Sequence, residues 1–347
     1  MTALTQRLPL RFPIIQAPMA GVQGWELAAA VSDTGALGSL PCAMLTPEAI
    51  RKAVSQIRAR TTGPINLNFF AHQQPTPDPA AQEAWLSQFR PFYQELDVPL
   101  PAGPSGASRQ PFNEILADLV CELKPEVVSF HFGLPAPALM TKVRDSGALV
   151  LSTATTVAEA RWLADHGADA IIAQGWEAGG HRGLFLDQDI SNQLGTFALL
   201  PQVVAAVDVP VIAAGGIADA RGVRAAMALG ASGVQVGTVY LLCPEATTSA
   251  VHRAALQSDA GLTTAVTNVF SGRPARGIVN RMIRALGPMS DQAPAFPLAT
   301  AASAPLRAKA ESLGSGDFSP LWAGQNISGC QPLPARALTQ GLAEGLT

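Results

Sequence analysis

Eight short apolar segments alternate with segments of helical spacing along the first 240 residues, and this alternation limits the fold more than any other feature. The apolar segments lie at 13–21, 36–40, 65–70, 127–133, 149–153, 168–174, 209–217 and 233–238. Short, nearly continuous apolar runs are typical of strands in a parallel sheet whose faces are covered by helices. The pattern therefore predicts an α/β fold, a (β/α)8 TIM barrel, with a doubly wound sheet as the structural alternative.

Capping residues support the helices between these strands. Thr46 precedes Pro47 at the start of one expected helix, and Gly35, Gly167 and Gly230 follow the ends of others. Threonine before proline is typical of a helix start, and glycine is typical of a helix end. The helices are expected at 25–34, 47–60, 112–123, 137–145, 157–166, 196–207 and 219–229.

Two segments do not fit the alternation. Residues 71–109 contain seven prolines and one expected helix, at 81–96, and a connection this long is typical of a lid or an insertion. Beyond Cys243, helices are expected at 246–256, 265–270, 278–286 and 306–313, with a proline-rich joint at 288–305. We therefore expect residues 1–243 and 318–347 to form the barrel, and 244–317 to form a small C-terminal helical subdomain over the barrel mouth.

The composition excludes several classes of protein. The chain is 48% hydrophobic and 14% charged, which suits a large buried core. Its net charge of −3, without a Lys/Arg cluster, gives no footprint for nucleic acid. No uninterrupted apolar run is long enough for a membrane span, so a cytoplasmic location is expected. The four cysteines lie far apart without metal-ligand spacing, which predicts reduced thiols and no metal site.

The strand at 168–174 leads into a glycine-rich segment that carries polar side chains. Gln174 ends the strand, and Gly179 and Gly180 precede His181. The carboxyl ends of barrel strands hold the chemistry of such folds, and glycines allow close approach of backbone to a ligand. Histidine is the side chain whose ordinary pKa lies near neutral pH, so His181 is expected to serve catalysis or substrate binding more than a purely structural hydrogen bond. Glu177 either orients His181 or is solvated.

Other polar residues and glycines follow neighbouring strands. Gly215-Gly216 and Gly237-Thr238 end the last two strands, where many barrels bind a phosphate, although such glycines can also serve only as tight turns. Gln174 and Asn66 can bond the edge of a heterocycle or be satisfied core amides. His131 ends the fourth strand and is expected to point towards the barrel mouth. No catalytic triad can be assembled from the sequence.

In these motifs the chain resembles the nitronate monooxygenases, FMN enzymes formerly called 2-nitropropane dioxygenases. The matching segments span nearly the whole length, at 13–19, 174–183, 213–217, 235–238, 271–276 and 322–325. The resemblance implies FMN as cofactor, His181 as the active-site histidine, and substrate contacts from His131 and His181. It implies a set of cofactor-binding residues: Ala17, Pro18, Met19, Asn66, Gln174, Gly179, Gly180, Gly215, Gly216, Gln235, Val236, Gly237 and Thr238. The pocket tyrosines and lysine of some members have no clear counterpart here.

The resemblance also implies a reaction. An alkyl nitronate, with propionate 3-nitronate as one candidate, would be oxidised by O2 to a carbonyl compound and nitrite, with one electron passing to the flavin. His181 would bind the nitronate oxygens, or act as a base if neutral nitroalkanes are also substrates. The alternative is an NAD(P)H-dependent FMN reductase of the enoyl-ACP reductase type, and a barrel that only stores or senses a flavin is the non-enzyme alternative. The partners are thus small molecules, and a homodimer is compatible with the sequence.

Overall fold

Eight parallel strands form the centre of the molecule in the computed structural model, which describes residues 2–101 and 109–346. Their order is β1-β9-β8-β6-β5-β4-β3-β2, and an isolated parallel bridge between Ile15 and Leu37 joins the two ends of the sheet. The sheet is therefore a nearly closed barrel, as predicted, and not a doubly wound sheet. The strands are β1 (Ile14–Gln16), β2 (Gly38–Pro41), β3 (Ile65–Phe70), β4 (Val127–His131), β5 (Leu149–Ala154), β6 (Ala170–Gln174), β8 (Val211–Ala214) and β9 (Gly233–Val236).

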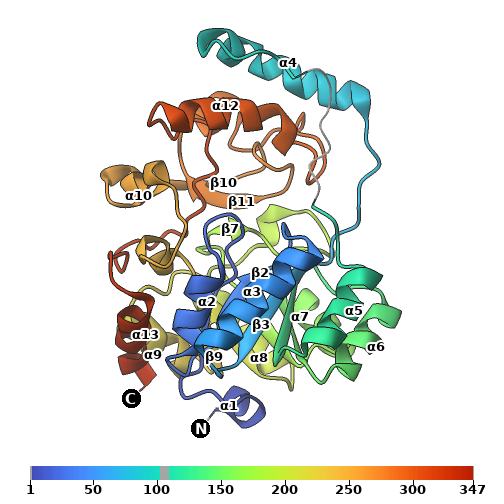
Figure 1. Ribbon diagram of the computed structural model, residues 1–347, viewed down its shortest axis with the longest axis vertical. Helices are drawn as coiled ribbons and strands as arrows, with labels where there is room; N and C mark the ends of the chain where they lie inside the picture. The colour runs from blue at the N-terminus through green and yellow to red at the C-terminus, as the bar shows by residue number, and fades with distance from the viewer. Residues whose placement is uncertain (1, 102–108, 347) are drawn as a thin grey trace.

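Helices cover the outside of this barrel (Figure 1). Side-chain caps fix where several of them begin: Thr46 accepts a hydrogen bond from the amide of Ala49, and Asn113, Thr156 and Asp219 cap three further helices in the same way. The barrel helices are α2 (Trp25–Ser32), α3 (Pro47–Arg60), α5 (Glu114–Leu123), α6 (Pro137–Asp145), α7 (Val157–Asp165), α8 (Thr196–Ala206) and α9 (Ala220–Ala228).

The two ends of the chain and several short helices complete the barrel. Helix α1 (Ala3–Arg7) begins the described chain, and α13 (Ala335–Ala343) packs against α2 and α9 near its end. The segment 318–347 thus returns to the barrel through α13. The 3-10 helices are η1 (Ile190–Asn192), η2 (Thr238–Leu242), η3 (Asp259–Leu262) and η4 (Glu344–Leu346).

Residues 244–317 contain strands as well as helices. The prediction of a helix at 265–270 is wrong. Strand β10 (Thr264–Thr267) pairs antiparallel with β11 (Ala275–Ile278), and β11 pairs in turn with β7 (Gly180–His181). A short run containing Thr264, Val266 and Thr267 suits a strand, and the apolar period alone could not separate the two states. The pairing ties His181 directly to the β10–β11 hairpin.

The helices of the C-terminal region also differ from their expected bounds. They are α10 (Ala250–Leu256), α11 (Arg281–Leu286) and α12 (Thr300–Ser312). Helix α11 begins later than expected because Ile278 ends β11 and Asn280 caps the helix. Helix α12 begins inside the proline-rich joint and continues through Pro305. The domain boundaries at 243/244 and 317/318 stay a prediction.

Helix α4 (Pro79–Glu95) lies within the long excursion, and it packs on α12, far along the sequence (Figure 1). Trp85 and Tyr93 are buried there and donate hydrogen bonds to the carbonyls of Ala299, at 3.3 Å, and Ala302, at 2.9 Å. The excursion therefore contributes to the layer above the barrel mouth. Within the described residues, no helix has both the length and the apolar character needed to cross a membrane.

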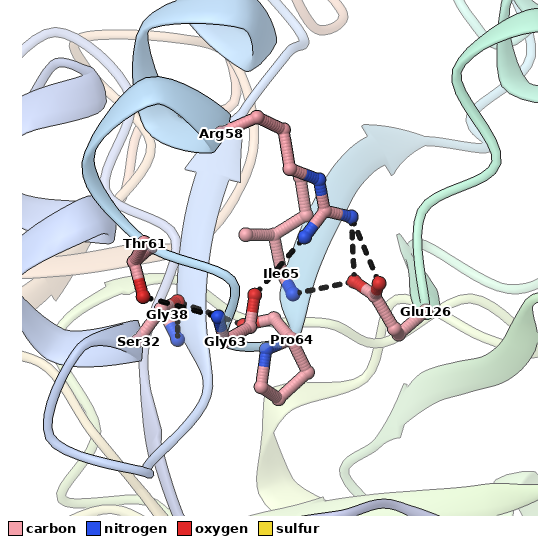
Figure 2. A network of polar contacts seen from close by, with 8 residues as sticks. All are labelled: Ser32, Gly38, Arg58, Thr61, Gly63, Pro64, Ile65 and Glu126. Atoms are coloured by element: carbon pink, nitrogen blue, oxygen red, sulfur yellow. Dashed lines mark hydrogen bonds and ion pairs between the residues drawn. The ribbon is translucent and has the colours of Figure 1, made fainter.

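At the opposite end of the barrel, carboxylates that lie just before two strands accept hydrogen bonds from the backbone near the starts of the neighbouring strands. Figure 2 shows the carboxylate of Glu126, just before β4, between the guanidinium of Arg58 and the amide of Ile65 at the start of β3. Both oxygens lie 2.8–2.9 Å from Nη2 of Arg58, and Arg58 also donates to the carbonyl of Gly63. Asp169 repeats the arrangement by accepting from the amide of Val150 at 2.8 Å.

Glu126→Ala is expected to lower the free energy of unfolding by about 1–2 kcal/mol, because it leaves the Ile65 amide and the Arg58 guanidinium without their acceptor. Urea unfolding of the purified protein measures this. Glu122→Ala is the matched control, since its ion pair with Arg51 is about half exposed and such pairs contribute roughly 0–1 kcal/mol. Equal losses in the two variants would contradict the assigned role of Glu126.

Candidate active site

A cavity of about 200 Å³ opens at the carboxyl ends of the barrel strands. Its wall combines the ends of the strands, the glycine-rich segment after β6, and the C-terminal residues Trp322, Gly324 and Asn326. The fold thus brings together residues from nearly the whole chain. All but one of the expected site residues line it: Ala17, Pro18, Met19, His131, Gln174, Gly179, Gly180, His181, Gly215, Gly216, Gln235, Val236, Gly237 and Thr238.

Asn66 is the exception. It is fully buried, its amide donates to Oγ of Ser39 at 3.0 Å, and it does not line the cavity. Asn68 lines the cavity instead, and its amide donates to Oγ of Ser129 at 2.9 Å. The two asparagines share one face of β3, but Asn68 lies nearer the carboxyl end of the strand. The alternation shows which face of the strand a residue lies on, but not how close that residue lies to the cavity. It therefore could not distinguish Asn68 from Asn66.

His181 lies on β7 inside an aromatic enclosure. Its Nε2 is 2.9 Å from Oγ of Ser271, and among the described residues its Nδ1 makes no hydrogen bond. The rings of Phe296 and Trp322 lie 5.3 and 5.5 Å from the imidazole, centroid to centroid. The ring is therefore held on one side and faces the cavity on the other.

The surroundings of His181 keep it uncharged. Burial lowers its pKa well below the usual value of 6.5, and the positive charge of Arg109 lowers it further. A neutral imidazole at pH 7 has one nitrogen that donates and one that accepts. The side chain can thus accept a proton or donate a hydrogen bond to an anion, depending on which ring nitrogen carries the hydrogen.

His131 and Gln174 hold the backbone of His181. Nε2 of each lies 3.0 Å from the carbonyl oxygen of His181, and both must donate to it. Nδ1 of His131 pairs with Oγ1 of Thr153, and Oε1 of Gln174 accepts from the amide of Gly183. Since both nitrogens of His131 are used, the substrate contact expected of it cannot be made through them. Burial lowers the pKa of His131 to about 4, so it stays neutral.

Two charged residues near His181 have structural partners. Glu177 does not orient His181: its carboxylate accepts from the amide and hydroxyl of Thr196, at 2.7 and 2.8 Å, where α8 begins. Arg182 is fully buried and donates to the carbonyls of Gln174 and Gly175. Sequence reasoning missed Arg182, although a lone arginine within a glycine run was a usable signal.

The turns after β8 and β9 form a cradle of unused donors, which we call the amide cradle: Gly215, Gly216 and Gly237. In the part of the chain that the structure describes, their N–H groups donate to no protein group. Gly215 and Gly216 have φ of +115° and +73°, which glycine adopts without strain. Beside them, Oε1 of Gln235 is buried without a partner. Such orphaned polar groups are typical of a ligand site.

The C-terminal segment closes this cradle from the other side. The amide of Gly324 donates to Oγ1 of Thr238 at 2.9 Å, and the side chain of Asn326 donates to the carbonyl of Gly216 at 2.9 Å. Gly179 packs against the same segment so tightly that a β-carbon would lie 2.5 Å from the backbone of Ala323. Asn326 was missed because its sequence neighbourhood gives no sign that it returns to the barrel mouth.

Arg109 is another residue that sequence reasoning missed. It lines the cavity, its guanidinium lies 5.6 Å from the ring of Phe296, and its Nη1 is buried without a partner. None of the described acidic residues forms an ion pair with it. A buried cation without an acidic partner is costly, and an anion in the cavity would offset that cost.

Comparisons with known proteins identify the family of this chain. A family model described as nitronate monooxygenase matches residues 1–345. The chain is 40% identical to a nitronate monooxygenase of Pseudomonas aeruginosa, covering 99% of this chain and 98% of that protein. It is 39% identical to a nitronate monooxygenase of Paraburkholderia phytofirmans, covering 99% and 94%.

Two solved structures are also similar to this chain. A nitroalkane oxidase from Streptomyces ansochromogenes superposes with a TM-score of 0.90 at 38% identity, covering 99% of this chain and 98% of that one. FabK from Thermotoga maritima has a TM-score of 0.71 at 27% identity, covering 99% and 96%. Because the family model matches almost the entire length of this chain, the chain belongs to the nitronate monooxygenases, a family of oxidoreductases.

Proposed function

We propose that this chain binds FMN in the cavity and oxidises alkyl nitronates with O2 to a carbonyl compound and nitrite. One observation carries the proposal: a single cavity joins the amide cradle, which suits a phosphate, to a neutral His181 and to Arg109, which has no acidic partner among the described residues. The likeness to a nitroalkane oxidase at 38% identity supports it further.

The residues present fit FMN. The free amides of Gly215, Gly216 and Gly237 would hold the phosphate, as backbone N–H groups do in other barrels. The unpartnered Oε1 of Gln235 would accept from a polar hydrogen of the cofactor. The loop 17–19 would line the flavin ring, and it is fixed because the amide of Met19 donates to Oε1 of Gln23 at 2.9 Å.

FMN, when bound, supplies the one-electron redox chemistry between the nitronate and O2. The protein binds and orients the substrate. A nitronate is already an anion, so no proton has to be removed before it is oxidised. Arg109 would pair with its negative charge, and His181, which lies nearby, would fix its position by a hydrogen bond. Phe70, Phe296 and Trp322 surround the imidazole and limit water near the reacting carbon.

Arg109→Gln is expected to raise the KM for ethyl nitronate about 10–100-fold, because a desolvated charge pair with the substrate is lost. Nitrite release at increasing nitronate concentration measures the change. Arg109→Lys is the matched control: it keeps the charge and should retain most of the affinity. An unchanged KM in Arg109→Gln would show that the substrate anion binds elsewhere.

Nitrite release and O2 uptake by the FMN-loaded protein, with propionate 3-nitronate compared with simple alkyl nitronates, test the function. Anaerobic mixing with NADPH separates the reductase alternative. Rapid bleaching of the flavin absorbance, without nitrite formation from any nitronate, would favour an FMN reductase of the enoyl-ACP reductase type. Nitrite formation with no bleaching supports the proposal.

A further inference from the structure

We propose that Ser271 fixes the tautomer of His181, so that Nδ1 faces the cavity as a proton acceptor. The inference rests on the proposed function and assigns a positioning residue to His181 for the turnover of neutral nitroalkanes. Ser271 lies in the turn between β10 and β11, outside the cavity wall, and it is 2% exposed.

The tautomer follows from the hydrogen bonds of Ser271. Its Oγ lies 2.9 Å from Nε2 of His181 and 3.3 Å from the carbonyl oxygen of Arg273. A hydroxyl has one hydrogen, and a carbonyl can only accept, so the hydroxyl satisfies both contacts only by donating to Arg273. It must then accept from Nε2–H of His181. A neutral imidazole carries one N–H, which leaves the lone pair on Nδ1.

The hairpin that carries Ser271 is fixed relative to His181. Ala275 of β11 pairs directly with His181, and Arg276 pairs with Gly180. Gly272 turns the chain with φ of +87°, and a β-carbon there would lie 2.0 Å from the carbonyl of Pro294. Ser271 therefore reaches Nε2 from a packed turn. The carbonyl of His181, held by His131 and Gln174, fixes the other end of the residue.

The lone pair of Nδ1 permits a proton transfer that a nitronate does not need. In a neutral nitroalkane the α C–H bond breaks, its proton moves to Nδ1, and its electron pair becomes part of the C=N bond of the nitronate. The resulting imidazolium donates from Nε2 to Ser271 and from Nδ1 to the new anion. Ser271 touches no substrate in this step, so it is a positioning residue that acts through His181.

Ser271→Ala is expected to lower kcat/KM for nitroethane about 30–100-fold in the FMN-loaded enzyme, which is no more than the lower end of general-base contributions because His181 itself remains, and to change that for ethyl nitronate less than about 3-fold. Without Ser271, the imidazole can adopt the other tautomer, which presents N–H to the cavity. Ser271→Thr keeps the hydroxyl and should restore most nitroethane turnover. Ser303→Ala removes a buried hydroxyl from α12 and is the matched control.

Each outcome decides a separate question. Equal losses on both substrates, or no loss, would overturn the role of Ser271. Nitronate turnover without nitroethane turnover by the unmodified enzyme would overturn the inference and leave the proposed function intact. If neither compound yields nitrite, the proposed function fails. Nitrogen NMR of the protein with isotope-labelled histidine identifies the tautomer even in that case. The signals of His181 are those that disappear in His181→Asn, and a protonated Nδ1 among them would overturn the assignment.

Discussion

His181→Asn is expected to lower kcat/KM for nitroethane by about 1,000-fold and that for ethyl nitronate by about 10-fold. Nitroethane needs a base to take its α-proton, and His181 is the residue whose free ring nitrogen faces the cavity. A nitronate has already lost that proton, so it loses only a binding contact. Steady-state nitrite release with both substrates measures the ratio.

His166→Asn is the matched control, because His166 is exposed and its ring stacks on Trp162 outside the cavity. It should leave both activities unchanged. The pH profile gives a second readout. Burial and Arg109 hold the pKa of His181 well below 6.5, so the base stays unprotonated as pH falls through 6.5. Nitroethane turnover should therefore remain level there and be lost only at lower pH. Equal, small effects of His181→Asn on both substrates would exclude the base assignment.

The barrel could be predicted from the sequence because its signals are local. Each barrel strand is a short apolar run, and several helix starts carry a cap of their own, such as Thr46 or Asp219. The failure at 265–270 has a local cause as well. A short run is compatible with either state, and pairing with β11, which is not visible in the run itself, makes it a strand.

The site residues also differ in whether their signals are local. Glycines at strand ends, such as Gly216 and Gly237, mark turns where the backbone has to be free of side chains, and a sequence can show this. Side-chain roles depend on distant partners. Gln174 lines the cavity as expected, yet both ends of its amide bond the His181 loop. Arg109 and Ser271 reach the site from an excursion and a hairpin, and only tertiary structure places them beside His181.

The largest effect expected outside His181 concerns the amide cradle. Gly237→Asp should raise the Kd for FMN at least about 100-fold, because it places a carboxylate beside a phosphate, and a 1.4 kcal/mol change is tenfold. Gly237 suits the test since its φ of −121° is open to any residue, whereas Gly216, at +73°, would add backbone strain. A β-carbon at Gly237 lies 3.2 Å from that of Ala17, so some loss from crowding is also expected.

Gly237→Asn separates crowding from charge, because asparagine has nearly the shape of aspartate without its charge. Titration of the flavin into each purified variant gives the two affinities, and thermal unfolding verifies that both variants fold. Riboflavin, which lacks the phosphate, is the second control. If the cradle holds the phosphate, Asp should weaken FMN binding far more than Asn does, and the two variants should bind riboflavin alike. Equal losses of FMN affinity in both would mean that the phosphate lies away from Gly237, and that the free amides of the cradle serve another group.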